Sequence, residues 1–537
     1  MSKIILAINA GSSSVKVSVY SYTPTSPNNN HPPSKDDDDN NNPADQLDTS
    51  LTELAQIQIS NLTASPALLT YTPLRDQSSS SSLKNSPLPA SISTPRTAFQ
   101  KILTTLLQDP DLPELSSAAD IAVAVHRIVH GGGDFTTPTW LDDDTTLAHL
   151  ARLSDLAPLH NGGALEIVGA VRELGDRQKD GDGKGDGSRK GGGKGKVRNL
   201  GLFDNMFHSS LPPQEREYMI SPAKARSEGL RRYGFHGLSC AFMTRAVGAW
   251  LEKEEKTPPT SPPPPPPSSL TRQQQQGSAN PKGPNLIALH LGSGCSATCI
   301  RAGVSLATSM GLTPVSGLPG ATRSGDVDPS LIFHYTHSAG KLSTASAAAA
   351  AADAEAGASG GEGGGGSRMH ISRAEEILNQ ESGWKSWVGT TDFGRLCGMA
   401  FPSSPSSSSS STNDEEEEEE RKLAHLAFTL LVTRIVDFIA AYYVKLAGQV
   451  DALVFAGGIG EKSVQLRAAV VEKIACLGFE LDASVNANPP AEGDVVEIGR
   501  RPGTEEKRHH RVVICRTDEQ REMARECVGV LAGEVSG

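Results

Sequence analysis

The chain has 537 residues, which is too long for one hydrophobic core, so at least two domains are expected. Its formal net charge of −12, with no broad basic face, argues against a nucleic-acid scaffold. Only 37% of the residues are hydrophobic, so part of the chain cannot bury enough apolar surface to fold.

Six polar or repetitive segments account for this low hydrophobic content. Their Asn/Asp, Ser/Pro, Gly/Lys, Pro/Gln, Ala/Gly and Ser/Glu compositions predict disordered insertions that loop out of a compact fold. Long surface loops cost little closure entropy, so such a fold tolerates them. The segments are 23–50, 76–95, 174–196, 255–284, 338–367 and 402–420.

Between these segments strand and helix patterns alternate, which predicts an α/β chain with mixed sheets. The expected strands are 3–9, 15–21, 121–129, 198–203, 285–291, 451–456 and 511–516. The expected helices are 97–107, 163–173, 238–252, 421–448, 463–477 and 518–531.

Two further features bear on where the protein works. The apolar run near 425–448 is interrupted by Thr433, Arg434, Asp437 and Lys445, so we expect a buried core helix and no membrane span. The seven scattered cysteines and the absence of a signal-like N-terminus predict reduced thiols and a cytoplasmic protein.

Three glycine-rich turns each follow an expected strand: INAGSSS (8–14), LHLGSG (289–294) and FAGGIGE (455–461). Backbone N–H groups in such turns can bind phosphate. A single turn of this kind is more often a plain surface turn, and none matches the Walker or dinucleotide pattern. Three of them in one chain nevertheless favour a nucleotide.

Several charged or titratable residues lie near strand ends or in turns. Arg127 ends a buried strand, where arginine usually forms a surface ion pair but can also bind a carboxylate or phosphate. Asp204 directly follows a strand, a position typical of a metal ligand or of a helix N-cap. His160, His236 and Arg323 lie in turns rich in Pro or Gly. Taken together, these groups fit phosphoryl transfer, which needs cations and a metal ligand around the phosphate.

The order of the motifs extends this interpretation. NAGSSSVK, HRIVHGGG, LAPLHN, FDNMFH, YGFHG, HLGSG, TSMGLTPVSGLPGATRSGDVDP, GGIGE and RTDEQ occur in the order found in acetate kinases. The chain therefore resembles the acetate kinase family, and the resemblance covers nearly everything outside the insertions. It implies a two-domain actin-like ATPase (ribonuclease H-like) fold. The expected domains are 1–204 with 520–537, and a nucleotide-binding domain of 205–519.

The resemblance also implies an activity. It is the reversible transfer of the ATP γ-phosphoryl group to acetate by direct in-line attack, with ADP and acetyl phosphate as products. Mg²⁺ is the expected cofactor, with Mn²⁺ as an alternative, and the expected form is a cytoplasmic homodimer without nucleic-acid or membrane partners.

Three other functions stay open. A propionate or butyrate kinase differs by one or two methylenes, which changes binding by only about 1–3 kcal/mol. A pyrophosphate-dependent acetate kinase would have a blocked adenosine entrance. A non-catalytic interaction protein would have no physical reason to keep Arg127, Asp204, His236 and Arg323 together.

The resemblance assigns roles to single positions. The residues that correspond to catalytic ones are Arg127, Asp204, His236 and Arg323. The two arginines also correspond to binders of acetate and of the phosphoryl group, and His160 to a supporting histidine. The expected metal-associated residues are Asn9 and Glu519, and the expected acetate methyl pocket consists of Val129, Leu159, Phe235 and Pro314. The expected nucleotide-binding residues are Ser12, Lys16, His290, Gly292, Ser293, Gly294, Asp392, Gly458, Ile459 and Gly460.

Two positions among the expected nucleotide-binding segments depart from the family pattern. Ser293 stands where the family commonly has Asn in HLGNG, and Gly394 stands where an Arg is frequent. Both departures predict altered nucleotide affinity or base preference, and neither affects the four residues matched to the catalytic set.

Overall fold

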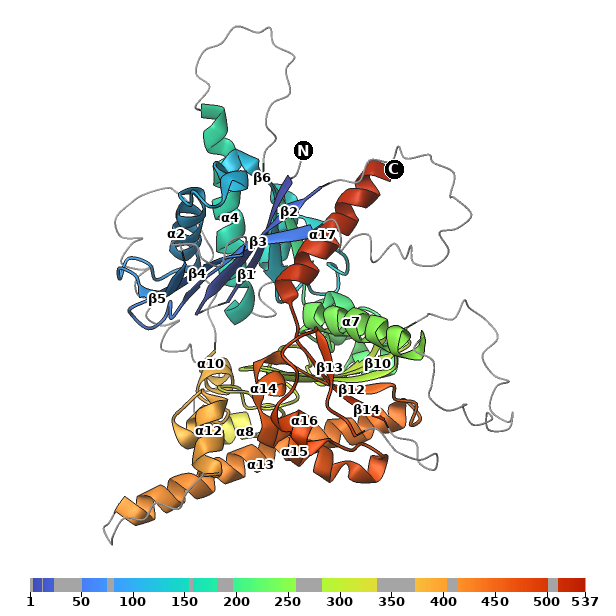
Figure 1. The fold of residues 1–537 in the computed structure, drawn as a ribbon. Helices are drawn as coiled ribbons and strands as arrows, with labels where there is room; N and C mark the ends of the chain where they lie inside the picture. The colour runs from blue at the N-terminus through green and yellow to red at the C-terminus, as the bar shows by residue number, and fades with distance from the viewer. Residues whose placement is uncertain are drawn as a thin grey trace, which may run out of the picture. The chain divides into compact units, whose positions relative to one another are not determined.

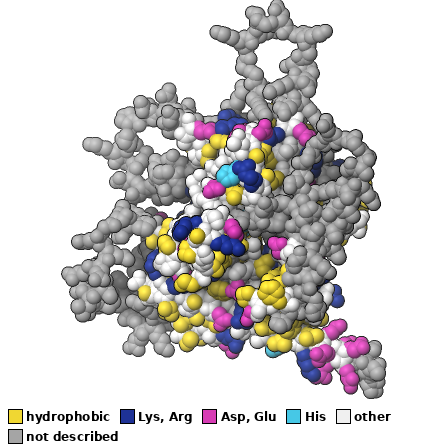
Figure 2. Space-filling model, turned by 180° about the vertical axis from the view of Figure 1, so that it is seen from behind, with side chains coloured by type: hydrophobic (Ala, Val, Ile, Leu, Met, Phe, Trp, Pro, Cys, Tyr) yellow, Lys and Arg dark blue, Asp and Glu magenta, His cyan; other side chains and the backbone are white. Residues whose placement is uncertain are grey.

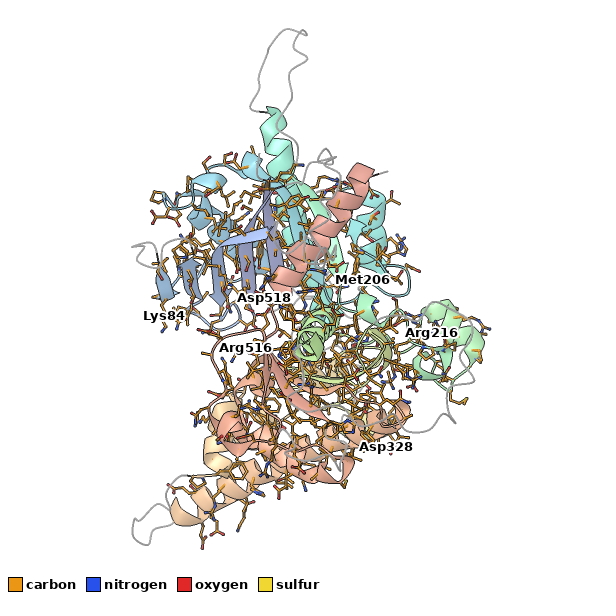
Figure 3. All side chains as sticks on the ribbon, turned by 45° about the vertical axis from the view of Figure 1, so that its right-hand side comes forward. Lys84, Met206, Arg216, Asp328, Arg516 and Asp518 are labelled. Carbon is orange, nitrogen blue, oxygen red and sulfur yellow. The ribbon has the colours of Figure 1, made fainter. Side chains whose placement is uncertain are left out.

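The computed structural model describes residues 3–11, 13–23, 51–74, 82–153, 158–180, 197–256, 283–335, 372–402, 413–500 and 510–536. The chain forms two compact units: unit 1 is Met1–Met206 with Asp518–Gly537, and unit 2 is Phe207–Thr517. Figure 3 labels Met206 and Asp518, where unit 1 ends and resumes. The sequence placed these boundaries after residues 204 and 519, so Glu519 belongs to unit 1 and not to the second domain.

Unit 1 contains a mixed eight-stranded sheet with the order β5-β4-β3-β2-β1-β6-β8-β7. Figure 1 labels its strands β1 to β6. Its strands are β1 (Lys3–Ala10), β2 (Val15–Tyr22), β3 (Leu51–Ser60), β4 (Leu68–Pro73), β5 (Leu83–Pro87), β6 (Ile121–Ile128), β7 (Thr139–Trp140) and β8 (Arg198–Phe203). Strands β1, β2 and β3 pair antiparallel, whereas β1, β6 and β8 are parallel neighbours. The carboxyl ends of β1, β6 and β8 therefore lie along one edge of the sheet.

Helices cover both faces of this sheet. They are α2 (Pro95–Leu107), α3 (Asp144–Leu153), α4 (Pro158–Asp180) and α17 (Glu519–Ser536). Ile4, Leu6 and Ile8 of β1 share one hydrophobic core with α2 and α4. Ile5 and Ala7, which point to the other face, are also fully buried, and α17 packs along β1, β2 and β6. This alternation explains why β1 reads as a continuous apolar run.

Unit 2 contains a mixed six-stranded sheet with the order β11-β10-β9-β12-β14-β13. Its strands are β9 (Leu286–Leu291), β10 (Cys295–Arg301), β11 (Val304–Thr308), β12 (Ala452–Ala456), β13 (Val495–Glu497) and β14 (Arg511–Cys515). As in unit 1, three antiparallel strands are followed by two parallel ones. The two units thus repeat one core topology, and the expected mixed sheets are confirmed.

The helices of unit 2 pack on its sheet in the same alternating way. They are α5 (Pro213–Arg216), α6 (Pro222–Glu228), α7 (Gly237–Lys256), α8 (Leu331–Tyr335), α10 (Arg373–Gln380), α11 (Lys385–Val388), α12 (Phe393–Ala400), α13 (Asn413–Lys445), α14 (Gly457–Lys462), α15 (Val464–Lys473) and α16 (Ala483–Ala487). Leu286 and Ala288 of β9 share a core with α7 residues, whereas Ile287 and Leu289 share one with α13 residues.

Helix α13 is longer than predicted. Within the described residues, its portion Glu415–Lys445 is long and apolar enough to cross a membrane by length and composition, so the polar residues named above do not exclude a span on that criterion. The helix contributes Leu431, Ile435 and Ile439 to the unit 2 core, which is the packing of a core helix. Its amino-terminal part carries exposed Glu415–Glu420, seen as a magenta group in Figure 2.

Every expected strand and helix is present, with shifted ends. The prediction that whole low-complexity segments loop out is wrong at four places: β5 lies within 76–95, α4 continues to Asp180, α7 continues to Lys256, and α13 begins at Asn413. β5 forms because it can pair with β4, and the glutamate run is helical because glutamate is a good helix former. Segments 24–50, 75–81, 181–196, 257–282, 336–371 and 403–412 lie outside the described residues.

Candidate active site

The carboxyl edge of the unit 1 sheet gathers three polar side chains. Asn9 lies near the end of β1, Arg127 near the end of β6, and Asp204 directly after β8. The parallel register sets Asn9 opposite Arg127. In open α/β sheets this edge is where ligands bind, because the strand ends leave side chains and backbone groups exposed there.

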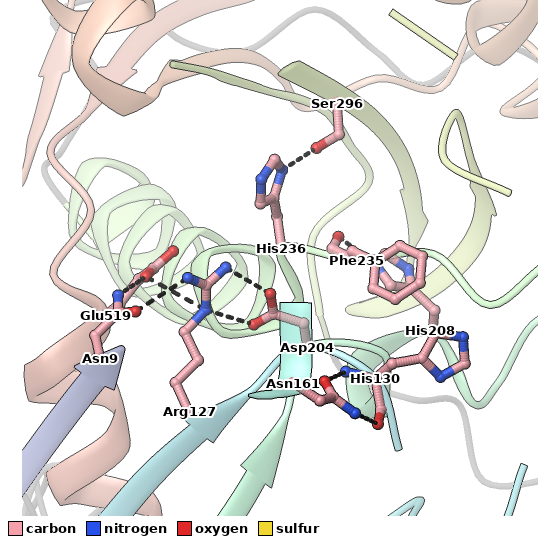
Figure 4. Close-up of polar contacts among 10 residues, drawn as sticks. All are labelled: Asn9, Arg127, His130, Asn161, Asp204, His208, Phe235, His236, Ser296 and Glu519. Atoms are coloured by element: carbon pink, nitrogen blue, oxygen red, sulfur yellow. Dashed lines mark hydrogen bonds and ion pairs between the residues drawn. The ribbon is translucent and has the colours of Figure 1, made fainter. Parts of the chain in front are cut away.

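Arg127 is the centre of this group (Figure 4). Its Nε donates to Asp204 Oδ1 at 3.0 Å and its Nη2 to Asp204 Oδ2 at 2.6 Å, which is a bidentate pair. Its Nη1 donates to Asn9 Oδ1 at 3.1 Å, and Glu519 Oε2 lies 3.9 Å from Nε. The Asp204 side chain is 1% exposed and the Arg127 side chain 18%.

The charge state of this arginine follows from its surroundings. Burial opposes the charged form, but the carboxylates of Asp204 and Glu519 outweigh it, so the pKa of Arg127 is raised above its ordinary value. Arg127 is therefore a cation at neutral pH.

Asn9 and Glu519 are the residues expected near a metal, and they are in contact. Asn9 Nδ2 donates to Glu519 Oε2 at 3.0 Å, although 510 positions separate them in the chain. Carboxylate and amide oxygens are ligands of the kind that Mg²⁺ takes. The described residues contain no cluster of three or more His, Cys, Asp or Glu that could hold a metal. These two residues thus fit a cation that keeps water and phosphate ligands, and not an all-protein cage.

The first glycine-rich turn joins β1 to β2. Gly11 N–H donates to the Ser14 carbonyl at 2.8 Å, which closes the turn. Ser12 lies outside the described residues. Lys16 Nζ donates to Gln520 Oε1 of α17 at 3.2 Å, so the predicted phosphate-binding lysine is anchored to the helix that carries Glu519.

The turn that follows β6 leads toward α4. Val129, the first residue after β6, is half-buried. Leu159 and His160 lie in the first turn of α4, and their side chains are outside the description. The prediction that His160 lies in a turn is wrong. Proline fits the first turn of a helix, where its missing N–H is not needed, and the helix begins at Pro158.

Two asparagines that the sequence did not single out fix the turn beyond Arg127. Asn161 accepts from His130 N–H at 3.0 Å and donates to the His130 carbonyl at 2.8 Å. Asn205 accepts from Gly131 N–H at 2.8 Å. Because both asparagines are buried and their partners are backbone groups, they hold the polypeptide rigidly. Asn161 lies in the motif LHNGG and Asn205 in FDNMF, but the sequence does not show which backbone groups these side chains contact.

In unit 2, His236 lies immediately before α7. Its Nδ1 is 2.8 Å from Ser296 Oγ, and its ring lies 4.3 Å from that of His290, measured between centroids. Ser296 is 1% exposed and sits opposite His290 in the β9–β10 pairing. The sequence did not single out Ser296. The hairpin HLGSGCS could have identified it, because the register of a hairpin sets which residues face each other.

Arg323 approaches the second glycine-rich turn. A Cβ on Gly294 would lie 2.7 Å from Arg323 Nη1, so glycine permits this close approach. Gly292 N–H donates to the Gly294 carbonyl at 3.1 Å, and the Ser293 carbonyl accepts from Ala321 N–H at 2.8 Å. The structure therefore brings the HLGSG turn and the Arg323 segment together.

The third glycine-rich turn is a helix and not the flexible loop that the sequence predicted. Gly458, Ile459 and Gly460 belong to α14, which directly follows β12. Ala456 pairs with His290, so α14 begins beside the end of β9. Gly458 is exposed, and a Cβ added there would meet no atom within 4 Å.

The remaining predicted residues are distributed over both units. Asp392 is an exposed N-cap of α12 and accepts from Gly394 N–H at 2.8 Å. Phe235 and Pro314 are buried in unit 2, whereas the other two predicted pocket residues are in unit 1.

Comparisons with known proteins agree with the resemblance indicated by the sequence motifs. The sequence profile of the Acetokinase family matches residues 55–180, 191–258, 272–359 and 368–525. A "Probable acetate kinase" of Neurospora crassa is 42% identical, with 98% of this chain and 94% of that protein covered. One from Emericella nidulans is 41% identical, with 98% and 97% covered.

Solved structures share the fold. An acetate kinase from Porphyromonas gingivalis superposes with a TM-score of 0.63 at 24% identity, over 98% of this chain and 100% of that one. A propionate kinase from Francisella tularensis gives a TM-score of 0.62 at 23% identity, over 98% of each chain.

Proposed function

The chain belongs to the acetokinase family, and we propose that it transfers the γ-phosphoryl group of ATP reversibly to acetate, giving acetyl phosphate and ADP. It is thus a phosphotransferase with a carboxyl acceptor, built on the actin-like ATPase fold. The observation that carries the proposal is the bidentate Arg127–Asp204 pair at the carboxyl edge of β6 and β8, beside Asn9 and Glu519.

The reaction as proposed needs no strong general base. The acetate carboxylate is ionised at neutral pH, and one of its oxygens attacks the γ-phosphorus while the bond to the ADP oxygen breaks. Arg127 binds the negatively charged substrate, and Asp204 fixes the guanidinium plane. In unit 2, His236 and Arg323 are assigned to neutralising the charge on the equatorial oxygens.

We assign Mg²⁺ as the metal, held by Asn9 and Glu519 together with water and substrate phosphate. When bound, the ion supplies neutralisation of the phosphate charge. Removing divalent ions with a chelator should abolish turnover, and restoring Mg²⁺ or Mn²⁺ in separate samples ranks the two metals. Full activity in the chelated sample would contradict this assignment.

The direct test is formation of acetyl hydroxamate from Mg-ATP, acetate and hydroxylamine. The wild-type protein should give product, and Arg127→Ala, Asp204→Ala and His236→Ala should each suppress it. Lys422→Ala is a matched control, because Lys422 is exposed and pairs with the exposed Glu418 on α13. If none of acetate, propionate and butyrate gives a product, the enzyme assignment is overturned.

Substrate choice is tested in the same assay. Comparing kcat/KM for acetate, propionate and butyrate separates the acetate kinase from its longer-chain alternatives. Comparing ATP with pyrophosphate tests the other alternative. A Cβ added at Gly458, a predicted nucleotide-binding position, would meet no atom within 4 Å, and this lack of crowding favours ATP.

We also propose a homodimer located in the cytoplasm. Met219 and Ile220 of unit 2 are exposed at 104% and 46%, which favours a covered surface in the assembled protein. Light scattering should give the dimer mass for wild type and the monomer mass for Met219→Glu. All seven cysteines are free, as suits a reducing compartment, and a fluorescent fusion in cells tests the location.

A further inference from the structure

His236 has an unusual backbone conformation. Its φ is 58°, in the left-handed region that non-glycine residues seldom adopt. Its carbonyl accepts from Cys240 N–H at 2.9 Å, so this residue sets the direction in which α7 starts. A conformation of this kind persists only when the surroundings hold it in place. The question is which group does so.

A second histidine contacts the backbone next to it. His208 is 1% exposed, and its Nε2 lies 2.9 Å from the Phe235 carbonyl oxygen (Figure 4). A carbonyl can only accept, so Nε2 carries the proton. Burial lowers the pKa of His208 to about 4, so the ring is neutral near pH 7. Nδ1 then accepts from Ser305 Oγ, 2.8 Å away.

Packing adds to this hydrogen bond. Gly234 has a φ of 75°, and a Cβ there would lie 2.7 Å from ring atoms of His208 and from Thr308 Cγ2. The His208 ring therefore lies directly against the backbone at position 234. Ser305 and Thr308 both belong to β11, so the imidazole is fixed between the sheet and the segment before α7.

The bonded carbonyl determines φ of the next residue. The Phe235 carbonyl belongs to the peptide that precedes His236, and rotating that peptide is the way for φ to relax to a negative value. Rotation would turn the carbonyl away from His208 and leave a buried N–H without its acceptor. An unsatisfied buried donor is costly, so the bond opposes relaxation of the strained residue.

We propose that His208 is a positioning residue: by holding the Phe235–His236 peptide it fixes the left-handed turn that presents the His236 imidazole to its partner Ser296. This inference rests on the proposed function to the extent that it gives His236 a role in the reaction. His208 acts through His236 and does not itself contact substrate.

The test compares two replacements of His208. His208→Gln places an amide N–H near the position of Nε2, whereas His208→Leu keeps the volume without a donor. The leucine variant should lower kcat by about 10- to 100-fold, as expected for a misplaced reacting group, with KM for acetate and MgATP little changed. The glutamine variant should restore most of the loss. Tyr71→Phe, which removes a partly buried hydrogen bond to Asp109 in unit 1, is the control for destabilisation alone.

A double-variant cycle separates positioning from general damage. In a His236→Ala background, His208→Leu should cause no further fall in kcat, because its effect passes through the missing imidazole. A fall of equal size in both backgrounds would overturn the proposal, as would wild-type kcat in folded His208→Leu. If the leucine variant does not fold, Ser305→Ala should lower kcat by a smaller factor, and an unchanged kcat would count against the proposal.

A spectroscopic measurement keeps this inference distinct from the proposed activity. In ¹⁵N-histidine-labelled protein, the signals of His236 are identified by their loss in His236→Ala. They should shift or broaden in His208→Leu and stay in place in His208→Gln. Unshifted signals in His208→Leu would overturn the positioning role even if the wild-type enzyme proved active, and shifted signals would support it even if it did not.

Discussion

The two units share one core topology but hold their polar groups by different forces. In unit 1 the carboxyl edge carries an ionic network, in which Arg127 contacts Asp204 bidentately and lies near Glu519. In unit 2 two histidines are held by hydrogen bonds with uncharged groups: His236 Nδ1 lies 2.8 Å from Ser296 Oγ, and His208 Nε2 donates to the Phe235 carbonyl. The same fold thus supplies charge in one unit and orientation in the other.

This difference has an energetic consequence. Removing one partner of a buried ion pair leaves an uncompensated charge, which costs about 3–5 kcal/mol. Removing one partner of a neutral hydrogen bond typically costs about 1 kcal/mol. Changes in unit 1 should therefore have larger effects than equally conservative changes in unit 2.

The largest effect is expected for Arg127→Ala. It removes the cation that binds the substrate and leaves the buried Asp204 carboxylate uncompensated, so kcat/KM should fall by about 10²–10³-fold. The measurement is hydroxamate kinetics together with thermal unfolding. Arg172→Ala is the control, because Arg172 pairs with a largely exposed Asp144, and its kinetics should match wild type. A near-normal kcat/KM in Arg127→Ala would contradict the prediction that the ionic network of unit 1 has the larger effect on activity.

The next effect concerns pH and should appear in both units. Burial lowers the pKa of His126 in unit 1 and of His208 in unit 2 to about 4. Between that value and the ordinary pKa near 6.5, the unfolded chain binds more protons than the folded one. The contribution of these histidines to the free energy of unfolding is therefore fully present above pH 6.5. It falls as the pH is lowered toward 4, by about 1.4 kcal/mol per pH unit for each histidine.

Calorimetry between pH 8 and pH 5 tests this. Wild-type Tm should fall on acidification, and His126→Gln should show a shallower dependence than wild type. An identical slope in the variant would mean that His126 is not buried in its neutral form.

A smaller effect is expected for Ser296→Ala in unit 2. The variant removes the hydroxyl at His236 Nδ1 and creates no buried charge, so kcat should fall about 5- to 10-fold, the equivalent of one hydrogen bond. Steady-state kinetics and Tm are the measurements. A loss as large as that of Arg127→Ala would contradict the contrast between the units.

The smallest effect is expected for Gly294→Ala. The added Cβ would meet the far end of the flexible Arg323 side chain, which can shift, so kcat/KM should fall by only a few-fold. Gly398→Ala in α12 is the matched control: its Cβ would meet nothing within 4 Å, and activity should not change. Equal kinetics for the two alanine variants would show that Arg323 does not depend on this close approach.

Much of the fold could be predicted from local patterns. The alternation of buried strands and amphipathic helices indicated an α/β chain, and every expected element is present. The strands that escaped prediction include β3, β4 and β10. In β3, Gln56, Ile57, Gln58 and Ile59 alternate between polar and buried apolar residues, which is a strand pattern that local reasoning could have used. In β10, Cys295–Ile300 is buried throughout and shows no alternation, so its pairing with β9 and β11 identifies it as a strand.

The candidate site was predicted unevenly for the same reason. Arg127, Asp204 and His236 lie in short motifs next to strand or helix ends, so the sequence alone indicates their chemical role. Ser296 and His208 are ordinary core-like residues until the register of β9 and β10 and the packing of β11 place them beside the His236 segment.

The sequence by itself determined the types of the main elements, two of the three glycine-rich turns and the set of charged groups, because each depends on residues close together in the chain. Only the tertiary structure decided which of these groups meet. Glu519 reaches Asn9 across 510 positions since α17 returns to pack on β1. His208 reaches the Phe235 carbonyl since His208 and the adjacent Gly234 both lie against β11. Long-range packing fixes such distances, and the local hydrophobic periodicity of the sequence does not indicate them.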